Sequence, residues 1–413
     1  MNRLAALLCL GALVLSGCSG PNEPVRIGAV YPLTGSEDEG GVDELRGVQL
    51  AAQLMNQEGG VGGRPIQVVP IDVPAADAAP GAIRSLDEQG IDLVVGSYGS
   101  TISAPAAEAA ARRKMLFWET GAVGDMSGTG AGRFVFRVSP TGPVLGRSAI
   151  SFVAGELAPM LNRDAASLRF AVANVDDAYG RSVARGAVDE LRRRNLDVVG
   201  TFPYDAYHLD AARLVRRMRA TYPDVVFVSA YLQDGVSIRR QTVRQGLDLV
   251  ASIGTSSSYC LPMFGERLGT DALGLFASDK PDAGLLNAEG LTPSARRLLT
   301  RASAAYEEQH DEEMEAPALS GFAAAWALFH DVLPRAASLD AAGVGGAAST
   351  VRVPDGGLPN GSGLSFGAPG TADAGANLRA ASVIWEWVRV GERAVVWPPR
   401  FATSEIRPIE IAP

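Results

Sequence analysis

Short β-branched runs alternate with amphipathic helical stretches along this chain, and this alternation limits the possible folds more than any other feature. The run at 25–31 has the composition of a strand. The stretch after it repeats apolar residues at every third or fourth position: Val42, Leu45, Val48, Ala52 and Met55. That period gives a helix one apolar face. Strands that alternate with such helices predict βαβ units and a parallel sheet, so the expected fold class is α/β.

The same pattern recurs in two blocks. In the first block, strands are expected at 66–72, 92–96, 115–119 and 134–138, with helices at 79–89 and 104–113. In the second block, strands are expected at 169–175, 197–202, 225–229 and 249–254, with helices at 180–194, 209–222 and 320–333. Because the pattern restarts, we expect two domains built in the same way.

The C-terminal part departs from this pattern. Residues 341–375 are rich in Gly and Ala and have little periodicity. We expect a loop or a linker near a hinge there, because so many glycines bury too little surface to become ordered. The segments 383–390 and 393–397 flank Gly391-Glu392, which predicts a closing β-hairpin.

The N-terminus predicts export and lipidation. After Arg3, the apolar run at 4–15 has about 12 residues, fewer than the roughly 20 that span a membrane, so residues 1–17 are expected to be an export signal. Its end, Leu15-Ser16-Gly17-Cys18, resembles the bacterial lipobox, which implies cleavage before Cys18 and acylation of its thiol. Residues 18–24 would then form a lipidated tether. An ordinary signal or a short membrane anchor is the alternative.

Composition restricts the partners. The net charge is −9 and no basic run offsets it, which argues against nucleic acid or an anionic membrane surface as a partner. Of the three cysteines, Cys9 lies in the signal and Cys18 would carry lipid, so Cys260 remains alone in the body. An intrachain disulfide is therefore excluded. No later segment is expected to span a membrane, so the lipid would be the only anchor.

Four segments in register resemble one family. Residues 55–66, Met-Asn-Gln-Glu-Gly-Gly-Val-Gly-Gly-Arg-Pro-Ile, resemble the connection between the first helix and the second strand of the type I periplasmic solute-binding proteins of branched-chain amino acid uptake systems. Residues 28–35, 95–106 and 176–180 agree with that family in order and spacing. The similarity extends over residues 25–397.

The resemblance implies two doubly wound lobes with central parallel sheets, joined by three hinge crossings, that close on a ligand like a Venus flytrap. Lobe 1 would comprise 25–138 and 279–361, and lobe 2 would comprise 139–278 and 362–413. The resemblance also implies a monomer without a cofactor or a metal. Such a monomer would hand a small molecule to the permease and ATPase subunits of an ABC transporter.

Hydroxyl side chains mark the expected ligand site. In open α/β sheets, ligands bind beyond the carboxyl ends of the strands, and hydroxyls beside the amides of a helix N-terminus suit a carboxylate. By position, the resemblance assigns the ligand's carboxylate to Ser100 and Thr101, and to Thr120 with the backbone of Ala122. Ser103 is expected only to cap its helix.

The second lobe adds two aromatic residues and one departure from the family. By the resemblance, Tyr179 and Tyr231 match aromatics of the cleft, although Tyr179 could equally be a core anchor. Amino-acid binders of the family place an acid after the strand that corresponds to 249–254, where it pairs with the ligand's ammonium. Here that loop contains Ser256 among other hydroxyl residues and no acid. A buried ammonium without a counter-charge is costly. Either another acid therefore substitutes or the ligand lacks an amino group. Glu119 is the best candidate for a substitute acid by position.

Catalysis has little support in the sequence. The three histidines lie in unrelated contexts, and His330, four residues after Trp326, is expected to be a packed core histidine. Neither a nucleophile elbow nor a dinucleotide-binding motif is present. The sequence therefore favours a lipid-anchored receptor of the cell envelope that delivers a small amino acid or a carboxylate to an ABC importer. An envelope lipoprotein of the same fold with a regulatory or sensory role is the alternative, and a secreted hydrolase is a weaker one.

Overall fold

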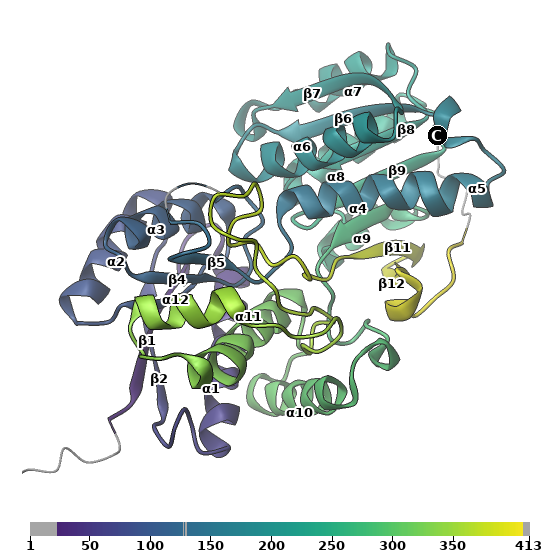
Figure 1. The fold of residues 1–413 in the computed structure, drawn as a ribbon. Helices are drawn as coiled ribbons and strands as arrows, with labels where there is room; N and C mark the ends of the chain where they lie inside the picture. Colours follow the sequence, from purple (N-terminus) through teal and green to yellow (C-terminus); the bar gives the residue numbers. More distant parts are fainter. Residues whose placement is uncertain (1–22, 127, 129, 408–413) are drawn as a thin grey trace, which may run out of the picture.

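Two β-sheets organise the part of the chain that the computed structural model describes, residues 23–126, 128 and 130–407. Each sheet lies between helices, and the two sheets occupy different halves of the molecule (Figure 1). The predicted α/β class with two doubly wound halves is therefore confirmed. The export signal and Cys18 lie outside the described residues.

The first sheet has parallel strands in the order β2-β1-β3-β4-β5. They are β1 (Val25–Tyr31), β2 (Ile66–Asp72), β3 (Leu93–Gly96), β4 (Leu116–Glu119) and β5 (Val135–Arg137). Every residue of β3 and β4 is buried, because helices cover both faces of the sheet. Pro70 lacks a backbone N–H, and it lies in β2, an edge strand that needs fewer ladder bonds.

Helices from two distant parts of the chain cover this sheet. They are α1 (Asp38–Gln57), α2 (Ala79–Glu88) and α3 (Ser100–Arg112), followed much later by α10 (Pro293–His310), α11 (Ala316–Trp326) and α12 (Ala341–Thr350). Helices α1 and α11 pack at close range, because a Cβ on Gly47 would overlap the carbonyl oxygen of Ala318. The indole nitrogen of Trp118 in β4 donates to the carbonyl of Ala324 in α11 at 2.8 Å. The chain thus returns to the first sheet after it has built most of the second.

The second sheet has the strand order β12-β11-β10-β9-β8-β6-β7. Its strands are β6 (Arg169–Val175), β7 (Asp197–Tyr204), β8 (Val225–Ser229), β9 (Ala251–Thr255), β10 (Phe276–Asp279), β11 (Val383–Arg389) and β12 (Glu392–Trp397). Strands β6 to β10 pair in parallel, whereas β11 is antiparallel to β10 and forms the predicted hairpin with β12. Helices cover both faces (Figure 1): α4 (Gly142–Phe152), α6 (Ala178–Arg193), α7 (Ala211–Arg219), α8 (Leu232–Arg244) and α9 (Pro262–Leu268).

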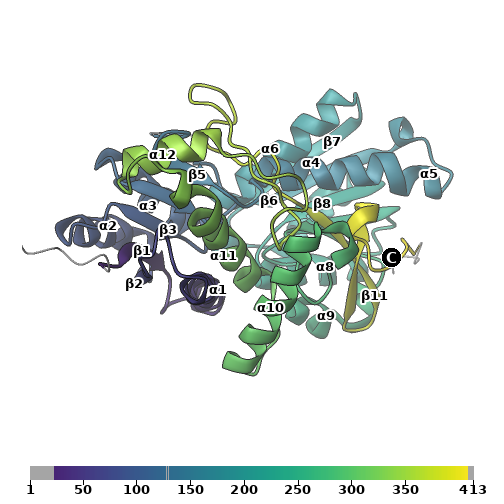
Figure 2. The same ribbon diagram turned by 60° about the horizontal axis from the view of Figure 1, so that its bottom comes forward.

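Three connections pass between the two halves, as predicted. They comprise residues 138–141 between β5 and α4, residues 280–292 between β10 and α10, and residues 351–382 between α12 and β11. Figure 2 shows the third connection, in yellow-green, as an irregular segment that runs from α12 toward β11. Several crossings between two lobes permit a hinge motion while they restrict twisting.

The prediction of a loop over residues 341–375 was wrong in two respects. Residues 341–350 form α12, and the Asp340 side chain caps this helix by accepting a hydrogen bond from the Gly343 amide at 2.8 Å. The remainder is irregular but partly buried: residues 368–373 are exposed, whereas Phe366 is only 5% exposed and its ring lies 5.3 Å from that of Trp118. A few large apolar side chains and specific polar contacts therefore order a segment that its glycine content alone would leave flexible.

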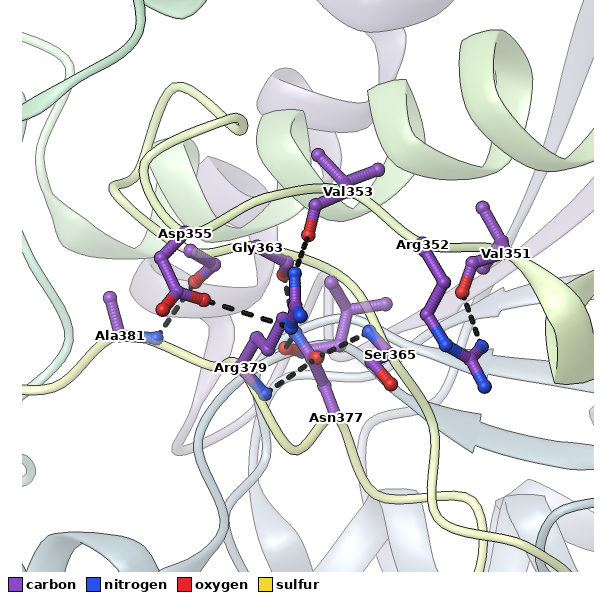
Figure 3. A network of polar contacts seen from close by, with 11 residues as sticks. Val351, Arg352, Val353, Asp355, Gly363, Ser365, Asn377, Arg379 and Ala381 are labelled. Atoms are coloured by element: carbon purple, nitrogen blue, oxygen red, sulfur yellow. Dashed lines mark hydrogen bonds and ion pairs between the residues drawn. The ribbon is translucent and has the colours of Figure 1, made fainter.

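Asn377 is the centre of those polar contacts (Figure 3). Its side-chain nitrogen donates to the carbonyls of Val138 and Gly363 at 3.0 and 2.9 Å. Its Oδ1 accepts from the backbone amides of Ser365 and Arg379, both at 3.1 Å. Buried backbone groups need hydrogen-bond partners, and the Asn377 side chain is the partner of four such groups. Because Val138 belongs to the first crossing, Asn377 fastens the third crossing to the first.

Helix α11 and the turns after it give two further corrections. The stretch Ala316–Arg335 is long and apolar enough to cross a membrane, so the prediction that no later segment has this length was wrong. Its most apolar part is 78% buried, as in a core helix of a soluble domain. His330 is half exposed and stacks on Trp326 at 5.4 Å, so the prediction of a packed core histidine was also wrong. The helix changes to a π-helical turn at Ala327–Val332, in which His330 is exposed and four neighbours are buried: Ala327, Leu328, Phe329 and Val332.

Candidate functional site

The predicted ligand residues gather where the carboxyl ends of β3 and β4 meet the amino end of α6. The loop after β4 fills the space between α3 and α6. A Cβ on Gly124 would lie 2.5 Å from the Cβ of Ser100 and 3.5 Å from the carbonyl oxygen of Ala178. Arg185 of α6 pairs with Asp125 of that loop at 2.9 Å. The two halves are therefore in contact at this edge.

We call the two sides of this edge the first wall and the second wall. The first wall consists of Glu37, Glu44, 98–101 and 119–122 of the first half. The second wall consists of 177–179, Tyr231 and 255–257 of the second half. Together, the two walls contain all eight residues that the sequence predicted for the ligand.

Ser100 and Thr101 form the first turn of α3, and both hydroxyls have protein partners. The Oγ of Ser100 accepts a hydrogen bond from the Gly124 amide at 2.9 Å. The Thr101 hydroxyl donates to Oε1 of Glu37 at 3.0 Å, and the other oxygen of Glu37 lies against Gly99. A carboxylate of the protein itself thus lies at the helix N-terminus predicted for a ligand's carboxylate.

The predicted cap of this helix was wrong. Helix α3 begins at Ser100, before the predicted start at 104, because the amides of Ile102 and Ser103 already bond to the carbonyl of Gly99. Ser103 consequently lies inside the helix, where its hydroxyl contacts the sulfur of Met126 at 3.7 Å. No side chain caps this helix.

Thr120, Ala122 and Glu119 lie together at the end of β4. The buried Thr120 hydroxyl donates to Oε1 of Glu44, so the Tyr31 hydroxyl, 2.7 Å away, donates to Thr120. Oε1 of Glu119 accepts from the backbone amides of Gly121, at 2.7 Å, and Ala122. The Ala122 amide predicted for a ligand's carboxylate is therefore bonded to Glu119.

Glu119 is fully buried, whereas the end of a strand usually exposes a glutamate. Burial raises the pKa of Glu119 to about 8, the nearby Arg137 opposes this rise, and the Glu44 carboxylate adds to it. Its second oxygen, Oε2, has no hydrogen-bond partner among the described residues. A buried carboxyl with one unpartnered oxygen can accept a hydrogen bond when it is ionised and donate one when it is protonated.

Glu44 is a site residue that the sequence reasoning missed. It is fully buried on α1, and burial raises its pKa to about 7 although the Lys280 ammonium opposes the rise. Lys280 belongs to the second crossing and donates to the carbonyl of Gly121 at 3.0 Å. A signal was present in the sequence, because Glu44 lies beside Leu45 and four residues before Val48, on the apolar face of the helix.

Tyr179, Tyr231 and Ser256 lie together in the second wall, where Tyr179 is only 2% exposed, as the alternative role of a core anchor requires. The rings of Tyr179 and Tyr231 are 5.4 Å apart. The Tyr179 hydroxyl lies 2.8 Å from that of Thr255, and Ser256 is close enough to influence its pKa, which burial raises. The Tyr231 hydroxyl donates to Oδ2 of Asp177 at 2.7 Å, so this wall ends in a carboxylate that the sequence did not single out.

Asp177 and Glu37 lie on opposite walls. Asp177 is the N-cap of α6, where its Oδ1 accepts from the Gly180 amide at 2.8 Å. Burial raises the pKa of Glu37, the Thr101 hydroxyl opposes this rise, and the Asp177 carboxylate adds to it. In the first wall, burial raises the pKa of the Tyr98 hydroxyl, and the charges of Glu37 and Glu44 add to that rise. The walls are therefore acidic and aromatic.

No group of three or more His, Cys, Asp or Glu side chains within residues 23–126, 128 and 130–407 is arranged to hold a metal ion. An acidic hollow of about 620 Å³ lies near the start of α1, lined by Asp38, Glu39, Val42, Asp43, Arg46, Glu312, Glu313 and Glu315. Arg46 neutralises part of it through ion pairs of 3.0 Å with Asp43 and Glu312. The walls remain the part of the structure in which the predicted residues converge.

Comparisons with known proteins agree with this architecture. Residues 24–380 match the profile of a family described as periplasmic binding protein. The chain is 26% identical over 412 residues to the Leu/Ile/Val-binding protein homolog 8 of Brucella suis biovar 1, covering 98% of this chain and 99% of the relative. It is 26% identical over 398 residues to the Leu/Ile/Val-binding protein homolog 7 of Brucella melitensis biotype 1, covering 96% and 97%.

Solved structures share the fold at low sequence identity. The leucine-binding protein LivK of Thermotoga maritima superposes with a TM-score of 0.73 at 18% identity, covering 90% of this chain and 97% of that protein. The branched-chain amino acid transporter substrate-binding protein LivJ of Streptococcus pneumoniae, in complex with isoleucine, superposes with a TM-score of 0.69 at 19% identity, covering 91% and 100%.

Proposed function

Because this chain belongs to the periplasmic binding protein family, we propose that it is a lipid-anchored solute-binding protein outside the cytoplasmic membrane. It captures a small amino acid or carboxylate-type ligand between its lobes and delivers it to the permease and ATPase subunits of an ABC importer. The lobes comprise 25–138 with 279–361 and 139–278 with 362–413. The names of the relatives, which refer to leucine, isoleucine and valine, support an amino acid as the ligand.

The meeting of the two walls is the observation that carries this proposal. A ligand stabilises a closed form only if it contacts both lobes, and the predicted residues come from both halves. Ser100 and Thr101 lie at the start of α3, and Tyr179 and Tyr231 lie across from them at the starts of α6 and α8. The crossings supply the hinge, and the contacts of Gly124 show how close the walls come.

Thermal denaturation in the presence of individual amino acids, organic acids and amides tests solute binding. A ligand that binds only the folded protein raises the melting temperature. The folded state is stabilised by about 2.7 kcal/mol when the free ligand concentration is about a hundredfold above Kd. Tyr231→Ala should abolish the shift because it removes one wall's aromatic face. Tyr207→Ala is the matched control, since Tyr207 is 95% exposed and lies outside both walls. If no small molecule shifts the transition of the wild-type protein, the proposal is refuted.

Lipid anchoring is tested separately. Cys18 carries the proposed acyl groups, so the Cys18→Ser protein should move from the membrane fraction to the soluble fraction after cell lysis. Mass spectrometry of the mature N-terminal peptide should show diacylglyceryl-modified cysteine in the wild-type protein. A mature chain that begins at another residue, without lipid, would refute the anchor and leave solute binding untouched.

A further inference from the structure

We infer that the cleft recognises its ligand through a cationic or N–H-donating group, held between Glu37 of the first wall and Asp177 of the second, and not through a carboxylate of the ligand. This inference rests on the proposed function, because it names the chemistry of the solute that the same cleft takes. Glu37 and Asp177 then replace the acid that is missing after β9.

Three of the four groups predicted to hold a ligand's carboxylate already donate to carboxyl groups of the protein. The Thr101 hydroxyl donates to Glu37, and the Thr120 hydroxyl donates to Glu44. The backbone amide of Ala122 donates to Glu119. Each of these groups has a single proton to donate. A carboxylate from a ligand would therefore have to displace an acid of the protein at these three positions, whereas the Ser100 Oγ accepts from the Gly124 amide and does not bond to an acid.

The first wall has two buried carboxyl oxygens that lack a hydrogen-bond partner among the described residues. They are Oε2 of Glu44 and Oε2 of Glu119. Lys280 and Arg137 offset part of the charge of these two acids but do not bond to these oxygens. A buried acceptor without a donor is costly. Because the pKa values of these acids are about 7 and 8, each can hold a proton near neutral pH. A ligand ammonium or N–H group would favour the ionised form and supply its missing donor, whereas a ligand carboxylate would require the acids to stay protonated.

Glu37 and Asp177 make the interlobe space itself anionic. Their hydrogen bonds come from Thr101, Tyr231 and a backbone amide, and neither acid forms an ion pair with a basic side chain of the described residues within 4.0 Å. Like charges on opposite walls oppose closure, and a cation between them removes that opposition.

Matched compounds separate the two ends of an amino acid. L-Leucine carries both charges, L-leucinamide keeps only the ammonium, 4-methylpentanoate keeps only the carboxylate, and 4-methylpentanamide keeps neither. Corresponding sets with the side chains of alanine and phenylalanine cover smaller and larger ligands. Isothermal titration calorimetry on the full mature protein should show binding of the amino acid and of the amino amide that carry the preferred side chain. The carboxylate with the same side chain should bind at least about tenfold more weakly than the amino amide.

Isosteric variants identify the acids. Glu37→Gln and Asp177→Asn keep the hydrogen bonds with Thr101 and Gly180 but remove one charge each, so each should weaken binding of the amino amide at least about tenfold. Glu39→Gln and Asp176→Asn are the matched controls, because both residues are exposed neighbours and should leave affinity unchanged.

The outcomes separate the inference from the proposed function. If the carboxylate binds as tightly as the amino acid, or if Glu37→Gln tightens carboxylate binding, the inference is overturned and the protein remains a solute-binding protein. If none of these compounds binds while the thermal screen finds another ligand that has neither a cationic nor an N–H group, the inference is again overturned. If neither method finds a ligand, the proposed function fails together with it.

Discussion

Asn377 offers the sharpest test of how the crossings are held together. Its side chain supplies four hydrogen bonds to the backbone groups of Val138, Gly363, Ser365 and Arg379. Asn377→Ala removes all four partners from buried or half-buried groups. At about 1 kcal/mol for each bond, the free energy of unfolding should fall by about 4 kcal/mol, a large part of the typical 5–15 kcal/mol of a domain.

Urea denaturation followed by circular dichroism measures this loss. Asn287→Ala is the matched control, because Asn287 accepts one exposed hydrogen bond from Glu289 and should lose about 1 kcal/mol or less. Since the bond to Val138 joins two crossings, Asn377→Ala should also increase hydrogen exchange at residues 138–141 and 351–382. A loss of less than about 1 kcal/mol, or no difference from Asn287→Ala, would refute the view that this side chain orders the third crossing.

Three further predictions address the buried acids, the helix packing and the contact between the walls. The pKa of Glu119 is about 8 in the folded protein against an ordinary value of 4.5. The protonated carboxyl therefore stabilises the fold fully below about pH 4.5, and this stability is lost as the pH rises toward 8, by at most about 1.4 kcal/mol per pH unit. Glu119→Gln should flatten the pH dependence of the melting temperature over that range. Gly47→Ala should destabilise the protein by about 2 kcal/mol, because the added Cβ meets the backbone of α11. Gly81→Ala, in open space on α2, should stabilise it by about 0.5–1 kcal/mol when measured by the same urea titration. Arg185→Ala removes a half-exposed ion pair with Asp125 that is worth less than about 1 kcal/mol. The population of an open form of the ligand-free protein should therefore rise by no more than about fivefold. X-ray scattering should show this change as a small rise in the radius of gyration.

Local pattern was enough to predict most strands and several helices. The predicted strands 66–72, 169–175 and 225–229 agree with β2, β6 and β8 at both ends. Runs of β-branched residues between turns depend only on neighbours in the chain, and so does the apolar stripe of α1. The same local information led to the two-block organisation. The assignment of Ser100, Thr120, Tyr179 and Tyr231 to the ligand site came from the resemblance to the family.

The partners of those residues were decided only by the tertiary structure. Thr101 bonds to Glu37 from 64 residues away, Thr120 to Glu44 from 76, and Tyr231 to Asp177 from 54. Such separations leave no periodic trace, because they result from how sheets and loops close on one another. Burial is decided in the same way, and it is burial that turns Glu119 and Glu44 from ordinary surface acids into groups with raised pKa values.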